Sequence, residues 1–399
     1  MSTLRVDTIT DEAGTGPVEF TNGINVSGGT VTGVDPFKYN AVSGATQALD
    51  VGSYNFFDAG TLTADTTVSF SNVPTEARWT YTAIGAGKTT FDLSGDAQVG
   101  YTSEAGSRNQ LNMKTDGTKA YIIDDSGYIR QYSLPTTGSI NNMSYDSVFI
   151  QVTQPQTGWI TDWYFKADGT SFYVCESNNN FQVYQYNLST AWDLSTFSYV
   201  GASPALTSQL VNSFGALTFS PDGSKMYAGR GNTGQSYQYT LSTPWTVSTA
   251  SYTGKSLNTN SAPFSEGYSI EGLGISSDGS KYFVYIGSQY AVFQYNLSTP
   301  FDISTASYSG ISSATILSSS YTPRGIYFDP AGLFYVATTY WSASASNYYS
   351  QRSLYELASI TFPSSVQNLS SSAPSVGSRK AYTFFTNDGG TTVWQDGAY

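Results

Sequence analysis

The chain has 399 residues, 39% of them hydrophobic and only 12% charged, so it is long enough to bury more than one packed core. Its formal net charge is −12 and its 17 Lys and Arg residues form no run, which argues against a nucleic-acid-binding protein. The absence of histidine excludes Ser-His-Asp and Cys-His catalysis, and the single cysteine, Cys175, excludes an intrachain disulfide and is expected to be a buried, inert thiol.

Residues 1–39 read as short strand-like pieces separated by glycine. Met1–Thr10 alternates apolar and polar residues, and the pattern breaks at Gly14–Pro17. A segment with so few large side chains cannot bury enough area to fold alone, so we expect a partner to order it, with a disordered tail as the alternative. It lacks the apolar core of a signal peptide, and no stretch of the chain approaches the ~18 apolar residues that insert into a membrane.

Residues 40–96 contain further strand-like runs and no apolar pattern at helical spacing. The runs are Asn55–Phe57, Thr66–Pro74 and Arg78–Tyr81. Their β-branched and aromatic residues are typical of half-buried strands.

A unit of about 53 residues then recurs five times between Asn109 and Leu357. In each copy a short apolar strand runs into a turn glycine, and these are Gly117, Gly169, Gly223, Gly279 and Gly332. An aspartate precedes the glycine in four copies, whereas the fifth has Ala331. A second landmark follows in each copy, namely Arg130–Leu134, Tyr184–Leu188, Tyr237–Leu241, Phe293–Leu297 and Ser353–Leu357.

Each unit contains four strand-like runs, which predicts one antiparallel blade of a β-propeller. In the third copy the runs are Ala216–Phe219, Lys225–Ala228, Ser236–Leu241 and Ala250–Thr253. The turn Ser220–Gly223 between the first two has the Pro and Asp-Gly chemistry of a tight hairpin. We therefore predict an all-β chain with a five-bladed β-propeller over residues 97–357, with a stacked open solenoid as the alternative.

Ring closure is predicted to use a strand from outside the repeats. Copies two to four end in similar outer strands, whereas the fifth copy has none after Leu357. Val99–Ser103, ahead of the first copy, is expected to supply that strand. Pairing the start of the ring with its end would remove an open sheet edge.

Residues 358–399 add the runs Ile360–Val366 and Lys380–Thr392. Taken in order with the runs of residues 40–96, they resemble a small β-sandwich module of tailed-bacteriophage tail fibres and other virion appendages. The resemblance implies a propeller inserted into a jelly-roll-like β-sandwich whose halves are residues 40–96 and 358–399. Residues 1–39 resemble the N-terminal ends of fibre proteins of marine phages, which implies a β segment for virion attachment or oligomerisation.

The same resemblance implies a virion structural protein, made in the host cytoplasm and located on the phage tail or particle surface. It would be a tail fibre whose N-terminal segment binds other tail or capsid proteins and whose propeller recognises a host-surface glycan or protein. A homo-oligomer, a trimer, is expected from the likeness to fibres. One alternative is a capsid or tail decoration protein without receptor binding. Another is a polysaccharide depolymerase that uses two carboxylates.

One repeat position predicts a binding site. Aligning the copies places five differing residues just ahead of the innermost strand: Asn109, Thr161, Gly215, Glu271 and Arg324. Asp162 follows one residue later. Such positions ring one mouth of a propeller channel, so Asn109, Asp162, Glu271 and Arg324 are predicted to bind a ligand there. Drift in a solvent-facing ring, or a solvated ion pair between Glu271 and Arg324, is the alternative.

The remaining repeated residues are expected to be structural. The Asp-Gly turns offer one acid each, too few oxygens for a dedicated calcium loop, and Asx-turn hydrogen bonding accounts for the aspartates. The equivalent aromatics Trp192, Trp245 and Phe301 are expected to pack between blades. We expect no catalytic residue, no cofactor and no metal.

Overall fold

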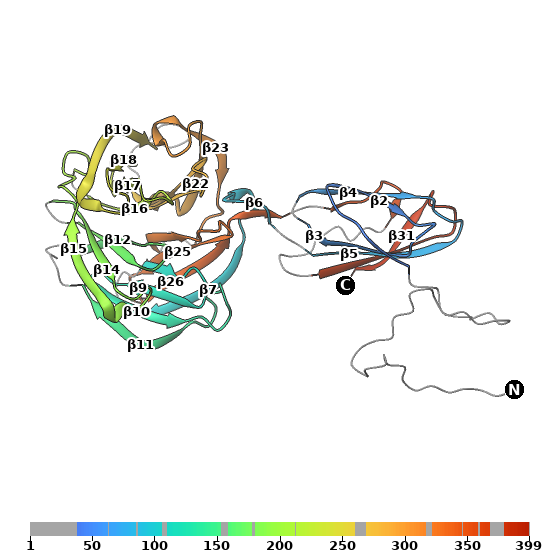
Figure 1. Cartoon of the computed structure of the whole chain (residues 1–399), viewed down its shortest axis with the longest axis horizontal. Coiled ribbons are helices and arrows are strands. Elements are labelled where there is room, and N and C mark those ends of the chain that lie inside the picture. Colours follow the sequence, from blue (N-terminus) through green and yellow to red (C-terminus); the bar gives the residue numbers. More distant parts are fainter. Residues whose placement is uncertain are drawn as a thin grey trace. The chain divides into compact units, whose positions relative to one another are not determined.

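The computed structural model describes residues 38–62, 64–84, 87–105, 110–152, 159–177, 180–211, 213–259, 269–316, 321–344, 346–357, 360–367 and 379–398. These residues form strands, short 3₁₀ turns and loops, and they include no helix long and apolar enough to cross a membrane. The chain divides into two compact units, Gly87–Leu357 and Met1–Ala86 with Ala358–Tyr399 (Figure 1). The N-terminal segment predicted for residues 1–39 lies outside the described residues up to position 37.

The unit Gly87–Leu357 contains five four-stranded antiparallel sheets, which are the blades of a β-propeller (Figure 1). Blade 1 consists of β8 (Gln110–Met113), β9 (Lys119–Ile123), β10 (Tyr128–Ser133) and β11 (Ser144–Gln151). Blade 2 consists of β12 (Trp159–Phe165), β13 (Ser171–Ser177), β14 (Val183–Leu188) and β15 (Phe197–Ala202). Blade 3 consists of β16 (Ala216–Phe219), β17 (Lys225–Gly229), β18 (Gln235–Leu241) and β19 (Ala250–Asn258). Blade 4 consists of β20 (Ile270–Ile275), β21 (Lys281–Ile286), β22 (Ala291–Leu297) and β23 (Ala306–Ser312). Blade 5 consists of β24 (Thr322–Phe328), β25 (Phe334–Trp341), β26 (Ser346–Ser353) and β7 (Gln98–Ala105). The 3₁₀ turns are η1 (Leu93–Gly95), η2 (Leu194–Thr196), η3 (Val247–Thr249), η4 (Gly287–Gln289) and η5 (Ile303–Thr305).

The blades close into a ring. The innermost strands β8, β12, β16, β20 and β24 contact one another in that order, and β24 contacts β8 again. Burial follows the same radial order: the inner strand β16 is buried along its whole length, whereas the outer strand β11 is largely exposed. The predicted five-bladed propeller is thus confirmed by strand pairing, and the open solenoid is wrong.

Four repeated turns have the predicted Asx geometry. Each turn aspartate accepts a hydrogen bond from the backbone N–H two residues later; in the first copy Asp116 Oδ1 accepts from Thr118 N at 3.0 Å. The following glycine has a positive φ, 68° at Gly117, which an L side chain adopts only with strain. The sequence therefore sets the tight link between the first two strands of these blades.

The predicted aromatic residues lie between blades. Trp192 of blade 2 stacks on Tyr121 of blade 1 with ring centroids 5.9 Å apart, and the Tyr121 hydroxyl donates to the Trp192 carbonyl. Trp245 and Phe301 receive the equivalent hydrogen bonds from Tyr173 and Tyr227. These contacts confirm the prediction of inter-blade packing.

The closing strand is the one that the sequence predicts. β7 pairs antiparallel with β26, aligning Gln351 with Gly100 and Tyr348 with Ser103. The landmark expected at Ser353–Leu357 is wrong by three residues, because Leu354, not Leu357, bonds back to the turn segment, as Leu188 does in blade 2. The third strand of the fifth copy lacks the Tyr-rich motif that aligns the other copies, so its position in the repeat was misassigned.

The boundary expected between residues 96 and 97 is also wrong. Residues 87–96 belong to the propeller unit because they supply the missing parts of blade 5. Phe91 has a φ of 53° and bonds to the Gly332 carbonyl, as Trp192 bonds to that of Gly169. β6 (Gly87–Thr90) pairs with β27 (Tyr355–Leu357). Blade 5 therefore takes the whole segment from β6 to β7, and not one strand alone, from upstream of the repeats.

The second unit consists of two sheets. The six-stranded sheet contains β1 (Tyr39–Ala41), β3 (Phe56–Thr61), β5 (Ala77–Ile84), β30 (Arg379–Thr386), β31 (Val393–Ala398) and β29 (Val366–Gln367), and the three-stranded sheet contains β2 (Thr46–Asp50), β4 (Thr66–Ser71) and β28 (Ile360–Thr361). Both sheets combine strands from before and after the repeats, since β5 pairs with β30 and β4 with β28. One hydrophobic core contains side chains of both sheets, such as Leu49, Val68, Trp79 and Phe384.

Candidate functional site

Two cavities lie at opposite ends of the five innermost strands. The first, here called the strand-start cavity, has a volume of about 190 Å³ and lies where these strands begin. It is lined by Gln110, Trp159, Ile160, Thr161, Ser213, Phe214, Gly215, Gly231, Glu271 and Arg324. The second, the turn-side cavity, has a volume of about 130 Å³ and lies beside the tight turns.

β-bulges build the strand-start cavity. Thr161, Glu271 and Arg324 are each the unpaired extra residue where the first strand of a blade skips one position against the second. A bulge changes the direction in which its side chain points and is common beside functional sites. The three residues hold equivalent positions in blades 2, 4 and 5, so one local irregularity brings three different side chains to a single cavity.

Glycine provides part of the cavity wall. A Cβ on Gly215 would lie 2.1 Å from the carbonyl oxygen of Ile270, and a Cβ on Gly231 would lie 2.4 Å from Ser213 Oγ. At Gly215 the obstacle is backbone, so that position does not tolerate a side chain and the backbones of blades 3 and 4 approach closely here, whereas at Gly231 the obstacle is the Ser213 side chain. Gly287 packs in the same way against Glu271: its Cβ would lie 3.1 Å from Glu271 Oε1. This packing restricts where the carboxyl group can sit.

The cavity carries one carboxyl and one guanidinium group among its lining residues. Burial raises the pKa of Glu271, while a hydrogen bond from Ser269 and the charge of Arg324 oppose that rise. The strand-start cavity is therefore polar, with acceptors and donors near one another and opposite charges that offset each other.

The structure brings together only part of the predicted site. Glu271 and Arg324 line the strand-start cavity with Thr161 and Gly215, as the repeat alignment predicts. Asn109 lies outside the described residues.

Asp162 is not a cavity residue. Its side chain is 3% exposed; Oδ2 accepts from Leu217 N at 2.7 Å and Oδ1 from Trp163 N at 2.8 Å. Asp162 therefore links blade 2 to the inner strand of blade 3. The structure therefore places Asp162 at the junction between blades and not with Glu271 and Arg324 in the cavity, because the bulge at Thr161 turns the neighbouring side chain away.

Sequence reasoning missed Gln110 and Trp159. Gln110 begins the inner strand of blade 1, and its Nε2 donates to the carbonyls of Thr161 and Arg324, in blades 2 and 5. Trp159 begins β12 and is 65% exposed. The signal available in the sequence was a tryptophan two residues before the divergent position of Thr161.

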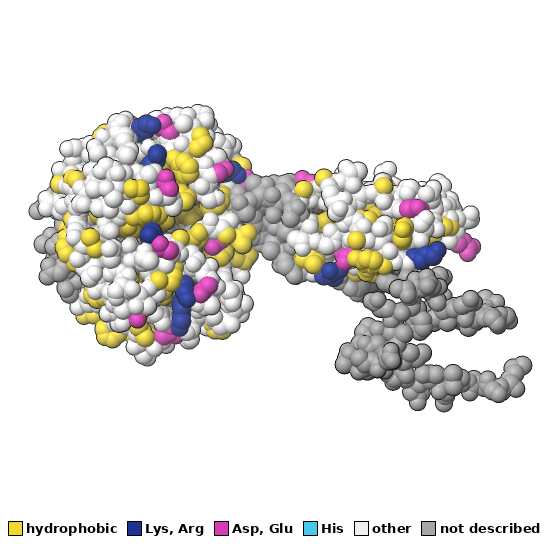
Figure 2. All heavy atoms as spheres, in the orientation of Figure 1, with side chains coloured by type: hydrophobic (Ala, Val, Ile, Leu, Met, Phe, Trp, Pro, Cys, Tyr) yellow, Lys and Arg dark blue, Asp and Glu magenta, His cyan; other side chains and the backbone are white. Residues whose placement is uncertain are grey.

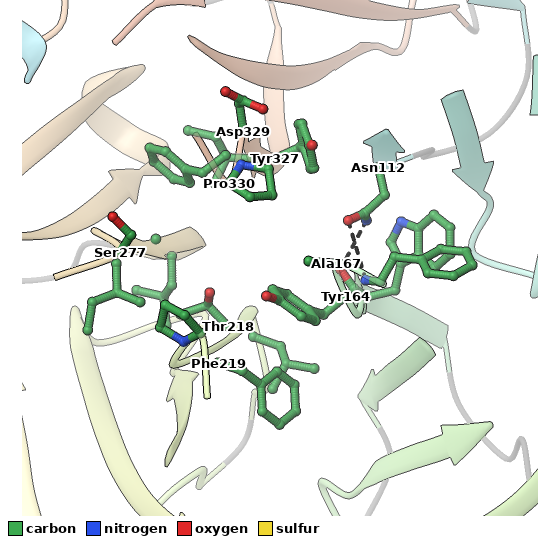
Figure 3. A pocket seen from close by; sticks show the side chains of 18 of the residues that line it. Asn112, Tyr164, Ala167, Thr218, Phe219, Ser277, Tyr327, Asp329 and Pro330 are labelled. Carbon is green, nitrogen blue, oxygen red and sulfur yellow. Dashed lines mark hydrogen bonds between the residues drawn. The ribbon is translucent and has the colours of Figure 1, made fainter. Parts of the chain in front are cut away.

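The turn-side cavity is more apolar, and sequence reasoning missed it too. Figure 3 shows Tyr164, Thr218, Tyr327 and Asp329 around its opening, with Asn112 hydrogen-bonded to the backbone of blade 2. Asn112, Tyr164, Thr218 and Tyr327 each precede the turn glycine by the same interval, so divergence at this second position could have revealed them. Figure 2 shows hydrophobic side chains gathered near the middle of the propeller unit, where Figure 1 labels β12 and β16.

The thiol of Cys175 is fully buried, as predicted, and Sγ donates to the Asp162 carbonyl at 3.2 Å. Burial raises its pKa well above the ordinary value. No group of three or more His, Cys, Asp or Glu residues that could hold a metal ion occurs within the described ranges.

No protein-family model and no curated protein matches the chain. Among solved structures, similar chains occur in the Mitotic Checkpoint Complex (11% identity, TM-score 0.36, covering 62% of this chain and 64% of that one) and in a functionally unknown protein from Desulfotomaculum acetoxidans (11%, 0.37, 79% and 75%). A third is the Cps50 (Swd1) β-propeller domain of Myceliophteria thermophila (8%, 0.36, 60% and 81%). Because these TM-scores lie below 0.5, the propeller assignment rests on this chain's own strand pairing.

Proposed function

We propose that this chain is a structural protein of a tailed-phage virion, a tail fibre whose propeller recognises a host surface without enzymatic activity. The observation that carries the binding role is the convergence of Thr161, Glu271 and Arg324, from equivalent bulges, on one cavity. Blades that repeat one scaffold and place different side chains at the channel suit a binding site on a repeat protein. The virion assignment rests on the resemblance of the flanking segments to fibre proteins.

We propose further that the unit flanking the repeats is a jelly-roll-like β-sandwich into which the propeller is inserted. The β5–β30 and β4–β28 ladders support this, because each joins a strand from before the repeats to one from after them. Insertion is tolerated where two neighbouring chain ends leave a folded module. Residues 1–39 would attach the fibre to other tail or capsid proteins and support a trimer.

Recognition would be weak at each copy and strong in the assembled particle. Several propellers displayed on one particle convert later binding events into intramolecular ones, which raises overall avidity without a single strong site. A host-surface glycan or protein presented in many copies suits this mechanism.

The arrangement of carboxyl groups favours binding over hydrolysis. A depolymerase of the usual type needs two carboxyl groups ~5–10 Å apart across a sugar. Among the described lining residues, the strand-start cavity has Glu271 and the turn-side cavity has Asp329, and Asp162 is occupied by two backbone donors. A capsid or tail decoration role remains the second candidate, because the sandwich and the N-terminal segment would serve it equally well.

Two measurements test the proposal. Antibody-gold labelling of intact particles should place the chain on tail fibres; labelling of the capsid alone would contradict the fibre assignment. Purified full-length protein, added to host cells before the phage, should reduce adsorption in a dose-dependent way. Full adsorption at saturating protein would favour the decoration role.

A further inference from the structure

Gln110 presents a buried acceptor to the strand-start cavity. Its side chain is 6% exposed, and its Nε2 donates to two backbone carbonyls, those of Thr161 and Arg324. Because both carbonyls require a donor, the orientation of the amide is fixed and Oε1 remains the acceptor. Oε1 has no partner among the described residues. A buried acceptor without a donor is unfavourable, so a molecule that donates a hydrogen bond here would be stabilised.

Other groups on the cavity wall suit a ligand rich in hydroxyls. Glu271 offers carboxyl oxygens, Arg324 offers guanidinium donors, and Ser213 has a hydroxyl group that acts in either sense, whereas the Thr161 hydroxyl is paired with Cys175 Sγ at 3.5 Å. The offsetting charges of Glu271 and Arg324 give no preference for a charged ligand. A molecule whose groups both donate and accept can satisfy all of these side chains at once.

Trp159 adds an apolar face at the same cavity. Its side chain is 65% exposed although it lines the wall with Thr161, two residues further along β12. Aromatic faces pack well against flat apolar surfaces such as the C–H face of a sugar ring. A cavity of about 190 Å³ has several times the ~30 Å³ share of one water molecule, enough for a ligand of monosaccharide size.

We propose that the strand-start cavity binds one uncharged monosaccharide unit of a host-surface glycan. Trp159 packs on the C–H face of the sugar, Gln110 Oε1 and Glu271 accept from its hydroxyls, and Arg324 donates to a hydroxyl or ring oxygen. The inference rests on the proposed recognition function and narrows it to glycan, to one cavity and to four side chains.

The test uses purified full-length protein and methyl glycosides of common neutral hexoses and N-acetylhexosamines, with binding followed by saturation-transfer NMR and calorimetry. At least one glycoside should bind, and Trp159→Ala and Glu271→Gln should each weaken its affinity by about 10-fold or more. Trp159→Phe, which keeps an aromatic face, should retain most of the affinity. Tyr164→Phe in the turn-side cavity should bind like the unaltered protein.

Several outcomes would overturn the inference. One is glycoside binding that Trp159→Ala and Glu271→Gln leave unchanged. Another is that no methyl glycoside binds even at saturating concentration, so that the cavity holds water only. A third is that free amino acids bind in the cavity and sugars do not. If the protein still blocks phage adsorption in these cases, the recognition function stands and only the cavity assignment fails. Unimpaired adsorption in the presence of the protein would instead refute the function on which the inference rests.

Discussion

Gln351 Oε1 accepts a hydrogen bond from the backbone N–H of Ile140 at 3.0 Å, which joins blade 5 to blade 1 across the seam of the ring. Its Nε2 donates to the Gly138 carbonyl at 2.6 Å. Other junctions repeat this link: Gln185 accepts from Val247 N, Gln238 from Ile303 N and Gln294 from Leu93 N. A glutamine at one repeat position thus links neighbouring blades at four junctions, the seam included, whereas the equivalent Gln131 of blade 1 donates to Asp146 of its own blade.

Replacing Gln351 with Ala is expected to lower the free energy of unfolding by ~1–3 kcal/mol, because the N–H of Ile140 is left buried without its acceptor. Gln238→Ala, at the junction of blades 3 and 4, is the matched control and should cost about as much. Urea unfolding of both variants provides the comparison. A loss at Gln238 with none at Gln351 would mean that the seam is open in solution.

The seam also contains a buried ion pair. Arg352 Nη2 lies 2.6 Å from Asp96 Oδ2, and the two side chains are 8% and 4% exposed. Asp96 further accepts from the Tyr335 hydroxyl at 2.8 Å and from Ala314 N at 2.9 Å. Asp96→Ala leaves the guanidinium buried without its charge partner, and we expect it to cost ~3–5 kcal/mol of unfolding free energy.

A second variant separates charge from packing at this position. The residue equivalent to Arg352 is tyrosine in the other four blades, namely Tyr132, Tyr186, Tyr239 and Tyr295. The double variant Asp96→Ala with Arg352→Tyr should therefore recover a substantial part of the stability lost in Asp96→Ala. A double variant no more stable than the single one would contradict the role of the unpaired charge.

The sequence alone was enough to predict the ring because the motifs that mark each blade are short and local. Asp-Gly turns and Tyr-rich third strands mark each blade without reference to distant contacts, and the missing outer strand of blade 5 directed attention to Val99–Ser103. The rest of the seam escaped prediction because Phe91 and Asp96 gain their roles only from contacts with Gly332 and Arg352, which are far away in sequence.

The sequence predicts those cavity residues that hold equivalent positions in the repeats. Alignment brought Glu271 and Arg324 together because equivalent positions of a ring face one channel. It could not distinguish Asp162 from them, since a bulge at Thr161 turns adjacent side chains in different directions and leaves no mark in the sequence. Gln110 was missed because its role depends on carbonyl groups of two other blades.

The turn glycines lead to a third prediction. A Cβ on Gly223 would lie 2.3 Å from the ring of Trp245, whereas a Cβ on Gly254 would meet nothing within 4 Å; both residues have positive φ, 69° and 78°. Gly254→Ala should therefore cost only the backbone strain of ~1–2 kcal/mol, and Gly223→Ala should cost a further ~1–3 kcal/mol for overpacking. Thermal unfolding of the two variants measures the difference, and equal losses would mean that the ring of Trp245 moves aside freely.

Asp162 leads to a prediction about pH. Burial raises its pKa well above 3.8; the N–H groups of Leu217 and Trp163 oppose the rise, and the charge of Glu271 adds to it. The folded state therefore holds the proton more tightly than the unfolded state does. This contribution to stability is fully present below the unfolded pKa, and it is lost as the pH rises through the folded pKa.

Asp162→Asn removes that titration while keeping the shape of the side chain. The variant should be less stable at every pH, because its amide NH₂ faces a backbone N–H in place of an acceptor. The stability advantage of the unaltered protein over Asp162→Asn should grow as the pH falls from about 7 towards about 4, by at most ~1.4 kcal/mol per pH unit for one proton. Urea unfolding of both proteins across this range measures the difference. An advantage that stays constant, or that shrinks on acidification, would show that Asp162 keeps a low pKa and serves the blade junction as a charged acceptor.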